Sequence, residues 1–319
     1  MIRILILSIA VFIVSEGFSQ SISITRTTGA ITLDAEMNEP EWENAEVAKN
    51  FIQYFPMDTS LANAQTEVRL LYDDKFIYVF AKMWRIESDD YVTPTLRRDY
   101  RGEANDGISV VFDTFKDKTN GFLFGVNPFG VQREGLVTNG GTRGDDLALN
   151  WDNKWFSEAK IHDKYWTAEM AIPFKTLRFK DGLKSWLVNF YRIDSEFAER
   201  STWNGLPRNF SMQALAYNRE MIWDSPLDKP GTNVSIIPYM AGSTFKDFEE
   251  GTPSEQRFDV GGDAKIGLGP ALNLDLTVNP DFHKLKLMSR LPTLIGSRYS
   301  FRNEDNSFLK MLICFQILD

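Results

Sequence analysis

Residues 66–85 read Thr66-Glu-Val-Arg-Leu-Leu-Tyr-Asp-Asp-Lys-Phe-Ile-Tyr-Val-Phe-Ala-Lys-Met-Trp-Arg85, and this stretch decides the fold class. Apolar and polar side chains alternate over 66–72 and again over 76–85, and the polar triplet at 73–75 separates the two runs. Alternation with a period of two is typical of a β-strand with one buried face, and the triplet is typical of a turn. The stretch therefore predicts a β-hairpin.

Similar alternating segments lie on both sides of this hairpin. They recur about every ten residues as far as residue 225, with turn residues between them and no long helical pattern. This spacing predicts an all-β fold, a jelly-roll-like β-sandwich over residues 21–225. The eight tryptophans suit either the core of such a sandwich or surfaces that stack on sugars.

The first twenty residues have the layout of a secretory signal peptide. Arg3 gives a positive start, residues 4–14 form an apolar run broken only by Ser8, and Gly17 and Ser19 are small residues before a cleavage position. The apolar run is much shorter than the ~20 residues that a membrane-spanning helix requires. We therefore interpret residues 1–20 as a signal peptide and expect an exported protein.

The composition excludes several classes of function. The net charge is −9 and no stripe of lysine and arginine is present, so we expect no nucleic-acid partner. The sequence has no nucleophile elbow, zinc-ligand spacing or phosphate-binding loop. With 44 acidic residues, the choice of a glycosidase carboxylate pair would be arbitrary. We therefore predict no catalytic residue.

The pattern changes after a linker rich in Pro, Gly and Asp at 224–231. The segments become longer, and one face of each is apolar, as in Leu272-Asn-Leu-Asp-Leu-Thr-Val278. Such segments are typical of outer-membrane barrels, so residues 232–282 are predicted to be initial β-barrel strands. Three strands cannot close a barrel, and we therefore expect the barrel to be incomplete.

Several short motifs in the first 195 residues occur in the order found in one family. They resemble the family-nine carbohydrate-binding modules, in which a strand, an acidic turn and a buried tryptophan open a β-sandwich of the DOMON-like type. The motifs are Ile31-Thr-Leu-Asp-Ala-Glu-Met-Asn-Glu-Pro-Glu-Trp42, Leu71-Tyr-Asp-Asp74, Ile77-Tyr-Val-Phe-Ala81, Asp106-Gly-Ile-Ser-Val-Val-Phe-Asp113, Phe124-Gly-Val-Asn-Pro-Phe-Gly130 and Ala168-Glu-Met-Ala-Ile-Pro-Phe174.

Other motifs resemble uncharacterised bacterial outer-membrane proteins in which this sandwich precedes a barrel. They are Arg97-Arg-Asp99, Val126-Asn-Pro-Phe-Gly-Val-Gln132 and Leu274-Asp-Leu-Thr-Val-Asn-Pro-Asp-Phe282. Residues 283–319 depart from the family's pattern. Back-translation with one restored base yields the family's Ser-Gln-Val-Glu-Val-Asp and Phe-Phe-Pro-Glu segments, so our hypothesis is that a frameshift truncates the barrel and leaves an aberrant or disordered tail at 283–319.

The resemblance implies a function in glycan recognition. We expect an exported sandwich that binds a polysaccharide or oligosaccharide, in the outer membrane, the periplasm or at the cell surface, with a role in carbohydrate catabolism. One alternative is a structural or plug domain of the barrel that binds no sugar. The other is an accessory module linked to O-glycosyl hydrolase activity, for which the sequence offers only family association.

Candidate sugar-binding aromatics are chosen by their surroundings. Aromatic faces cover the CH surfaces of pyranose rings, so a platform must be exposed. Three tryptophans lie in polar, loop-rich surroundings and are candidate platforms or loop packing: Trp151, Trp155 and Trp203. Trp84 ends a predicted strand and fits either role. Three others fit strand patterns and are predicted to be core residues: Trp42, Trp166 and Trp186.

The family resemblance also implies charged candidates. Arg98, Tyr100 and Asp106 lie near the position where a family ligand binds, although Arg98 also fits a solvated loop pair with Arg97. Glu103 and Ser109 replace the family's sugar-gripping residues. Some relatives hold a structural calcium ion through loop oxygens. Here Asp145, Asp146 and Asp152, around a glycine-rich loop, could serve as ligands, or they form an ordinary acidic loop.

Overall fold

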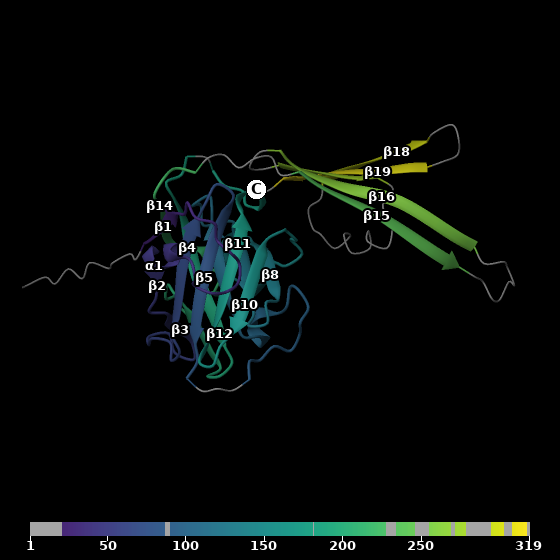
Figure 1. Cartoon of the computed structure of the whole chain (residues 1–319). Coiled ribbons are helices and arrows are strands. Elements are labelled where there is room, and N and C mark those ends of the chain that lie inside the picture. Colours follow the sequence, from purple (N-terminus) through teal and green to yellow (C-terminus); the bar gives the residue numbers. More distant parts are fainter. Residues whose placement is uncertain are drawn as a thin grey trace, which may run out of the picture.

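The computed structural model describes residues 21–86, 90–180, 182–227, 234–245, 255–268, 272–278, 295–302 and 308–317. Two layers of mainly antiparallel strands form a sandwich (Figure 1), which confirms the predicted all-β class. The predicted signal peptide lies outside the described residues. Within them, no helix has the length and apolar character needed to cross a membrane.

The first sheet of the sandwich contains the hairpin from which the fold was predicted. Its strands, in spatial order, are β10 (Phe156–Ile161), β11 (Tyr165–Pro173), β5 (Phe76–Trp84), β4 (Thr66–Tyr72) and the short β2 (Val47–Ala48). The hairpin of β4 and β5 pairs Thr66 with Met83 and Tyr72 with Ile77, so the predicted turn closes it.

The second sheet faces the first across the core. Its strands, in spatial order, are β14 (Arg219–Trp223), β12 (Ser185–Asp194), β6 (Gly107–Asp113), β7 (Gly121–Val126), β8 (Gln132–Val137) and β9 (Leu147–Ala148). The last residues of β12 also pair with β13 (Glu199–Thr202), on the edge of β12 opposite to β6. The short strand β3 (Ile52–Phe55) pairs in turn with β13.

The short strand β1 (Ile22–Arg26) connects the two sheets along one edge. Its first three residues pair in parallel with β14, and its last two pair in parallel with β4. The short helices lie in the connections. They are α1 (Pro40–Asn44), η1 (Gly102–Ala104), η2 (Asn139–Gly141), η3 (Gly144–Asp146), η4 (Phe174–Thr176) and η5 (Leu215–Tyr217).

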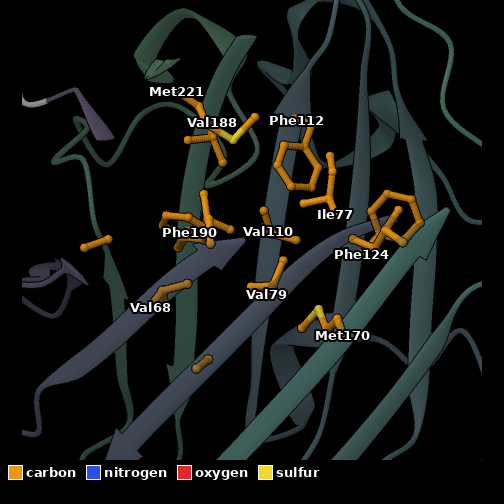
Figure 2. Close-up of a cluster of buried hydrophobic side chains, with 14 of the residues drawn as sticks. Val68, Ile77, Val79, Val110, Phe112, Phe124, Met170, Val188, Phe190 and Met221 are labelled. Atoms are coloured by element: carbon orange, nitrogen blue, oxygen red, sulfur yellow. The ribbon is translucent and has the colours of Figure 1, made fainter. Parts of the chain in front are cut away.

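The core lies between the sheets and follows the strand alternation (Figure 2). In β5, Ile77, Val79, Ala81 and Met83 face this core, and the intervening side chains face the outside of the first sheet. Trp42, Trp166 and Trp186 are at most 1% exposed, so the prediction that they are core residues is confirmed. Trp166 and Trp186 belong to the central cluster, whereas Trp42 covers the outer face of the first sheet.

The segment before β2 packs on half of that outer face. Trp42 in α1 contacts Phe80 with ring centroids 5.5 Å apart, in a cluster that includes Leu71, Tyr78 and Ala171. Glu169 of β11 lies fully buried at the border of this cluster, where one carboxyl oxygen accepts the backbone N–H groups of residues 34 and 35, each at 3.1 Å. The segment that contains α1 does not extend over the other half of this outer face, where Trp84 and Tyr165 lie.

A separate C-terminal sheet follows the sandwich. Its strands, in spatial order, are β15 (Val234–Phe245), β16 (Glu255–Leu268), β17 (Leu272–Val278), β19 (Phe308–Ile317) and β18 (Ile295–Arg302). The first three fall in the predicted barrel-strand segment. The last two fall in the segment predicted to be an aberrant or disordered tail, where the β-prone apolar run at 308–317 pairs with β17. The frameshift hypothesis and the domain boundaries stay predictions.

Candidate functional site

Two aromatic rings lie side by side on the uncovered half of the first sheet's outer face. Trp84 of β5 and Tyr165 of β11 are paired in register, so their side chains leave the sheet on the same side. Both are half-buried, and neither belongs to an apolar cluster of the described residues. Aromatic rings on an outer sheet face that belong to no apolar cluster are candidates for contact with a ligand.

Lys82 and His162 complete this surface. The Lys82 Nζ lies 4.1 Å from the centroid of the Tyr165 ring and 4.9 Å from that of Trp84. The His162 imidazole stacks on Tyr165 with centroids 4.4 Å apart, and its Nε2 lies 3.2 Å from Thr167 Oγ1. We call the four residues Lys82, Trp84, His162 and Tyr165 the Trp84 face. It combines two aromatic rings with polar groups that lie against them.

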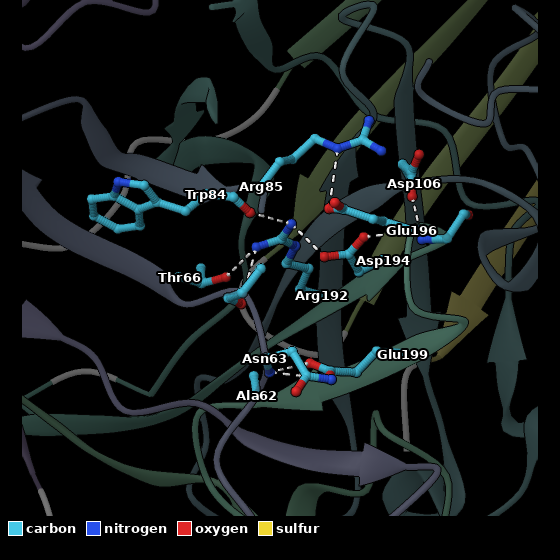
Figure 3. Close-up of polar contacts among 12 residues, drawn as sticks. Ala62, Asn63, Thr66, Trp84, Arg85, Asp106, Arg192, Asp194, Glu196 and Glu199 are labelled. Atoms are coloured by element: carbon cyan, nitrogen blue, oxygen red, sulfur yellow. Dashed lines mark hydrogen bonds and ion pairs between the residues drawn. The ribbon is translucent and has the colours of Figure 1, made fainter. Parts of the chain in front are cut away.

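A buried arginine fixes the backbone of Trp84 from the interior of the sandwich. Arg192 of β12 donates from Nη2 to the Trp84 carbonyl oxygen (2.7 Å) and to Asp194 Oδ2 (2.6 Å). Its Nη1 donates to the carbonyl oxygens of Ala64 and Gln65, both at 3.3 Å. Figure 3 shows the Trp84 indole pointing away from this network. The guanidinium therefore links the two sheets and positions the strand end that carries the indole.

A second buried ion pair lies beside the first. Arg85 Nε is 3.3 Å from Glu196 Oε2, with both side chains at most 4% exposed, and the guanidinium lies 4.3 Å from the centroid of the Tyr91 ring. Burial raises the pKa of Asp194, and the Arg192 guanidinium opposes this rise. Both ion pairs are buried away from water. Removal of one partner would leave the other charge buried and uncompensated, so the pairs hold their strands in a fixed arrangement.

Two of the three predicted tryptophan platforms are not exposed, which corrects the sequence-based expectation. Trp155 is 3% exposed; its ring packs edge-on against Phe124, and its Nε1 donates to Glu134 Oε2 at 3.2 Å. Trp203 is also 3% exposed and packs on Phe190. Both lie in the central core although polar residues are frequent around them in the sequence, and each adjoins a strand end: Trp155 precedes β10 and Trp203 follows β13.

The remaining predicted ligand contacts are dispersed. Trp151 is half-buried and packs on the rings of β7. Arg98 is paired with Glu134, whose side chain is fully buried, at the edge of the sandwich. Tyr100 is buried, and desolvation raises the pKa of its hydroxyl. Asp106 is buried and accepts the backbone N–H groups of residues 92 and 195, both at 2.6 Å. Arg98, Tyr100 and Asp106 therefore have structural contacts within the sandwich and its loops. Of all the predicted ligand contacts, Trp84 alone lies on the outer sheet face described above.

The three predicted calcium ligands do not form a cluster. Asp146 is buried, and its carboxylate accepts the Arg143 backbone N–H at 2.8 Å, an interaction that lowers the pKa of Asp146. Asp145 and Asp152 are exposed. Across the described part of the chain, no three His, Cys, Asp or Glu side chains are grouped to hold a metal ion.

Sequence reasoning missed Lys82, His162 and Tyr165. The alternation in 76–85 puts Lys82 and Trp84 on one face, and this signal was present. Nothing in the local sequence shows that the strand of Tyr165 pairs with β5.

No family model matches the chain, and no curated protein matches it. Solved structures to which the chain is similar include a family-nine carbohydrate-binding module from Caldicellulosiruptor kristjanssonii in complex with cellotriose. It is 14% identical, with a TM-score of 0.43, and the match covers 66% of this chain and 96% of the module. A structure of a family-nine module from the same organism with glucose is 12% identical, with a TM-score of 0.43, and the match covers 65% and 98%.

A third solved structure comes from Bacteroides uniformis and is described as "a putative carbohydrate-binding protein". It is 13% identical, with a TM-score of 0.49, and the match covers 64% of this chain and 99% of that chain. All three solved structures are thus similar to about two thirds of this chain, over nearly their whole length.

Proposed function

We propose that the sandwich is a carbohydrate-binding domain and that it binds its glycan on the Trp84 face. The observation that carries the proposal is the paired, half-buried rings of Trp84 and Tyr165, which lie on an outer sheet face and pack against no apolar cluster. Aromatic faces bind the CH surfaces of sugars, and nearby polar groups hold the hydroxyls. Lys82 and His162 supply such groups here.

Affinity electrophoresis of the full chain in gels that contain different polysaccharides tests this proposal. Replacement of Trp84 or Tyr165 by alanine removes one stacking ring, so we expect a loss of affinity of about tenfold or more for any glycan bound. Phe129→Ala is the matched control, because this ring is also exposed but lies in the turn between β7 and β8. Unchanged binding by both ring variants would refute the site.

A role in polysaccharide catabolism belongs to the same proposal, since binding keeps a polymer available for degradation. The plug-domain alternative predicts that no glycan in the panel retards the chain. The hydrolase-accessory alternative predicts that the bound glycan is cleaved when a partner hydrolase is added, and more slowly with Trp84→Ala. The same chain and the same glycans separate these three roles.

We also propose that the C-terminal sheet attaches the exported chain to a membrane, as the initial part of an outer-membrane barrel. One face of this sheet carries exposed apolar side chains in register, because Met240 lies opposite Val260 and Ile236 lies opposite Ala264. Ile236 and Met240 are 73% and 74% exposed. Apolar side chains so exposed to water favour a lipid environment.

Flotation with lipid vesicles tests the attachment. Ile236→Glu and Met240→Glu put charges on the apolar face, and we expect each to reduce the fraction of chain that floats. Thr277→Glu is the control, because Thr277 lies on the opposite face, paired with Asp263. Equal flotation of all variants would contradict the proposal, and fractionation of the cells that express the chain would show whether it is exported.

A further inference from the structure

We propose that the glycan bound on the Trp84 face is anionic, carrying carboxylate or sulfate groups, and that Lys82 selects it. This inference rests on the proposed carbohydrate binding at the same face and adds the chemical class of the ligand. Its basis is the position of the Lys82 ammonium group, together with the lack of an acidic partner for it among the described residues.

The Lys82 ammonium group is held beside the aromatic surface. Its Nζ lies within 5 Å of the centroids of both the Trp84 and the Tyr165 ring, at 4.9 and 4.1 Å. A cation near two ring faces is attracted by the negative potential of both π-systems, so the flexible side chain is held in this position before a ligand arrives. Because Lys82 is only half-buried, its charge remains open to an incoming group.

The one acidic residue directly opposite Lys82 in the sheet is paired with another side chain. Glu67 lies directly opposite Lys82 in the register of β4 and β5, but it pairs with Arg69 at 3.1 Å. On β11 the residue opposite Lys82 is Thr167, which carries no charge. Within the described residues, Lys82 forms no ion pair, whereas Lys116 is 2.6 Å from Glu220 on another surface.

The geometry of a charged sugar matches this arrangement. In a uronic acid the carboxylate is attached to the ring carbon next to the ring oxygen, so it projects from the edge of the pyranose. When the CH face of that ring covers an indole, the carboxylate lies beside the indole. Lys82 Nζ lies over the Trp84 ring, 4.9 Å from its centroid, so it can meet this carboxylate from the same side of the sheet. A hydrogen bond from an ammonium to a carboxylate or sulfate is about twice as strong as one between neutral groups.

The net negative charge of the chain opposes the binding of an anionic glycan everywhere except near a local cation such as Lys82. The net charge of −9 repels a polyanion at long range, so an attraction must come from a contact at a specific place. Contacts between exposed charges weaken with added salt. We therefore expect binding of an anionic glycan to weaken as the salt concentration rises, and binding of a neutral glycan to change little.

Two matched pairs of polymers test the inference with the full chain in affinity gels. Polygalacturonate is compared with the same polymer after methyl esterification of its carboxylates, and dextran sulfate is compared with dextran. The first pair reports on carboxylates and the second on sulfates. The variants are Lys82→Gln, which removes the charge, Lys82→Arg, which keeps it, and Lys75→Gln, a control in the exposed turn at the other end of β5.

We expect the charged member of at least one pair to bind about tenfold more tightly than its neutral partner. Lys82→Gln should abolish this preference, and Lys82→Arg and Lys75→Gln should retain it. Equal binding of charged and neutral members, or a preference that survives Lys82→Gln, would overturn the inference and leave the proposed carbohydrate binding intact. Failure of every glycan in the wider panel to bind would overturn both.

Discussion

Glu169 gives the sandwich a stability that decreases as the pH rises. Its side chain is fully buried, and desolvation raises the pKa of its carboxyl group from 4.5 to about 8, although the backbone N–H groups of Asp34 and Ala35 oppose the rise. A carboxyl with a raised pKa stabilises the fold when it is protonated. The contribution is complete below pH 4.5, the unfolded value, and is lost as the pH rises through about 8.

The magnitude follows from the difference between the two pKa values. About 3.5 pKa units correspond to an upper limit of about 5 kcal/mol in the free energy of unfolding. Glu169→Gln keeps the shape and one acceptor oxygen for the two N–H groups but cannot ionise. We therefore expect the variant to be more stable than the natural chain at pH 9, by about 2–5 kcal/mol, and equally stable near pH 4.5.

Urea denaturation followed by tryptophan fluorescence between pH 4.5 and 9 measures this difference. Trp42 is a suitable reporter because it is fully buried in the segment that contacts Glu169. Glu158→Gln is the matched control, since Glu158 lies opposite Glu169 on β10 but is exposed. If the natural chain and Glu169→Gln lose stability in parallel as the pH rises, the carboxyl is not the group responsible and the reasoning is wrong.

Two further predictions concern stability. Arg192→Met leaves Asp194 buried without its partner, so we expect thermal unfolding to show a destabilisation of about 3–5 kcal/mol; a change below about 1 kcal/mol would contradict the linking role. Gly141 has φ +64°, and a Cβ there would lie 2.6 Å from Val137 Cγ1, so Gly141→Ala should destabilise by about 1–3 kcal/mol. Gly144→Ala is its control because a Cβ at Gly144 meets nothing within 4 Å, and equal melting temperatures for the two variants would refute the steric argument.

Local pattern was enough to predict the strands and much of the core. The hairpin at 66–85 closes at the predicted turn because alternation and turn residues are local signals. The same alternation places Trp166 and Trp186 inside. Side chains in strands follow the strand's own period, so these positions require no knowledge of the distant chain.

The site depended on contacts that the local pattern does not contain. Trp155 and Trp203 lie among polar residues in the sequence, yet both are buried in the core that the two sheets form together. Tyr165 lies beside Trp84 only because β11 pairs with β5, strands that are far apart in the sequence. Pairing between distant strands is set by the whole topology, which a single sequence leaves open.

The parallel pairing of β1 has a mechanical consequence. Ile22 lies beside Met221 and Ile24 beside Trp223, so the first strand and the last strand of the sandwich run in the same direction. A force that pulls residue 21 away from the C-terminal sheet draws these two strands past each other along their axes. All of their hydrogen bonds then carry the load at once instead of opening one by one. The domain should therefore resist stretching between its two ends far better than its short first strand suggests.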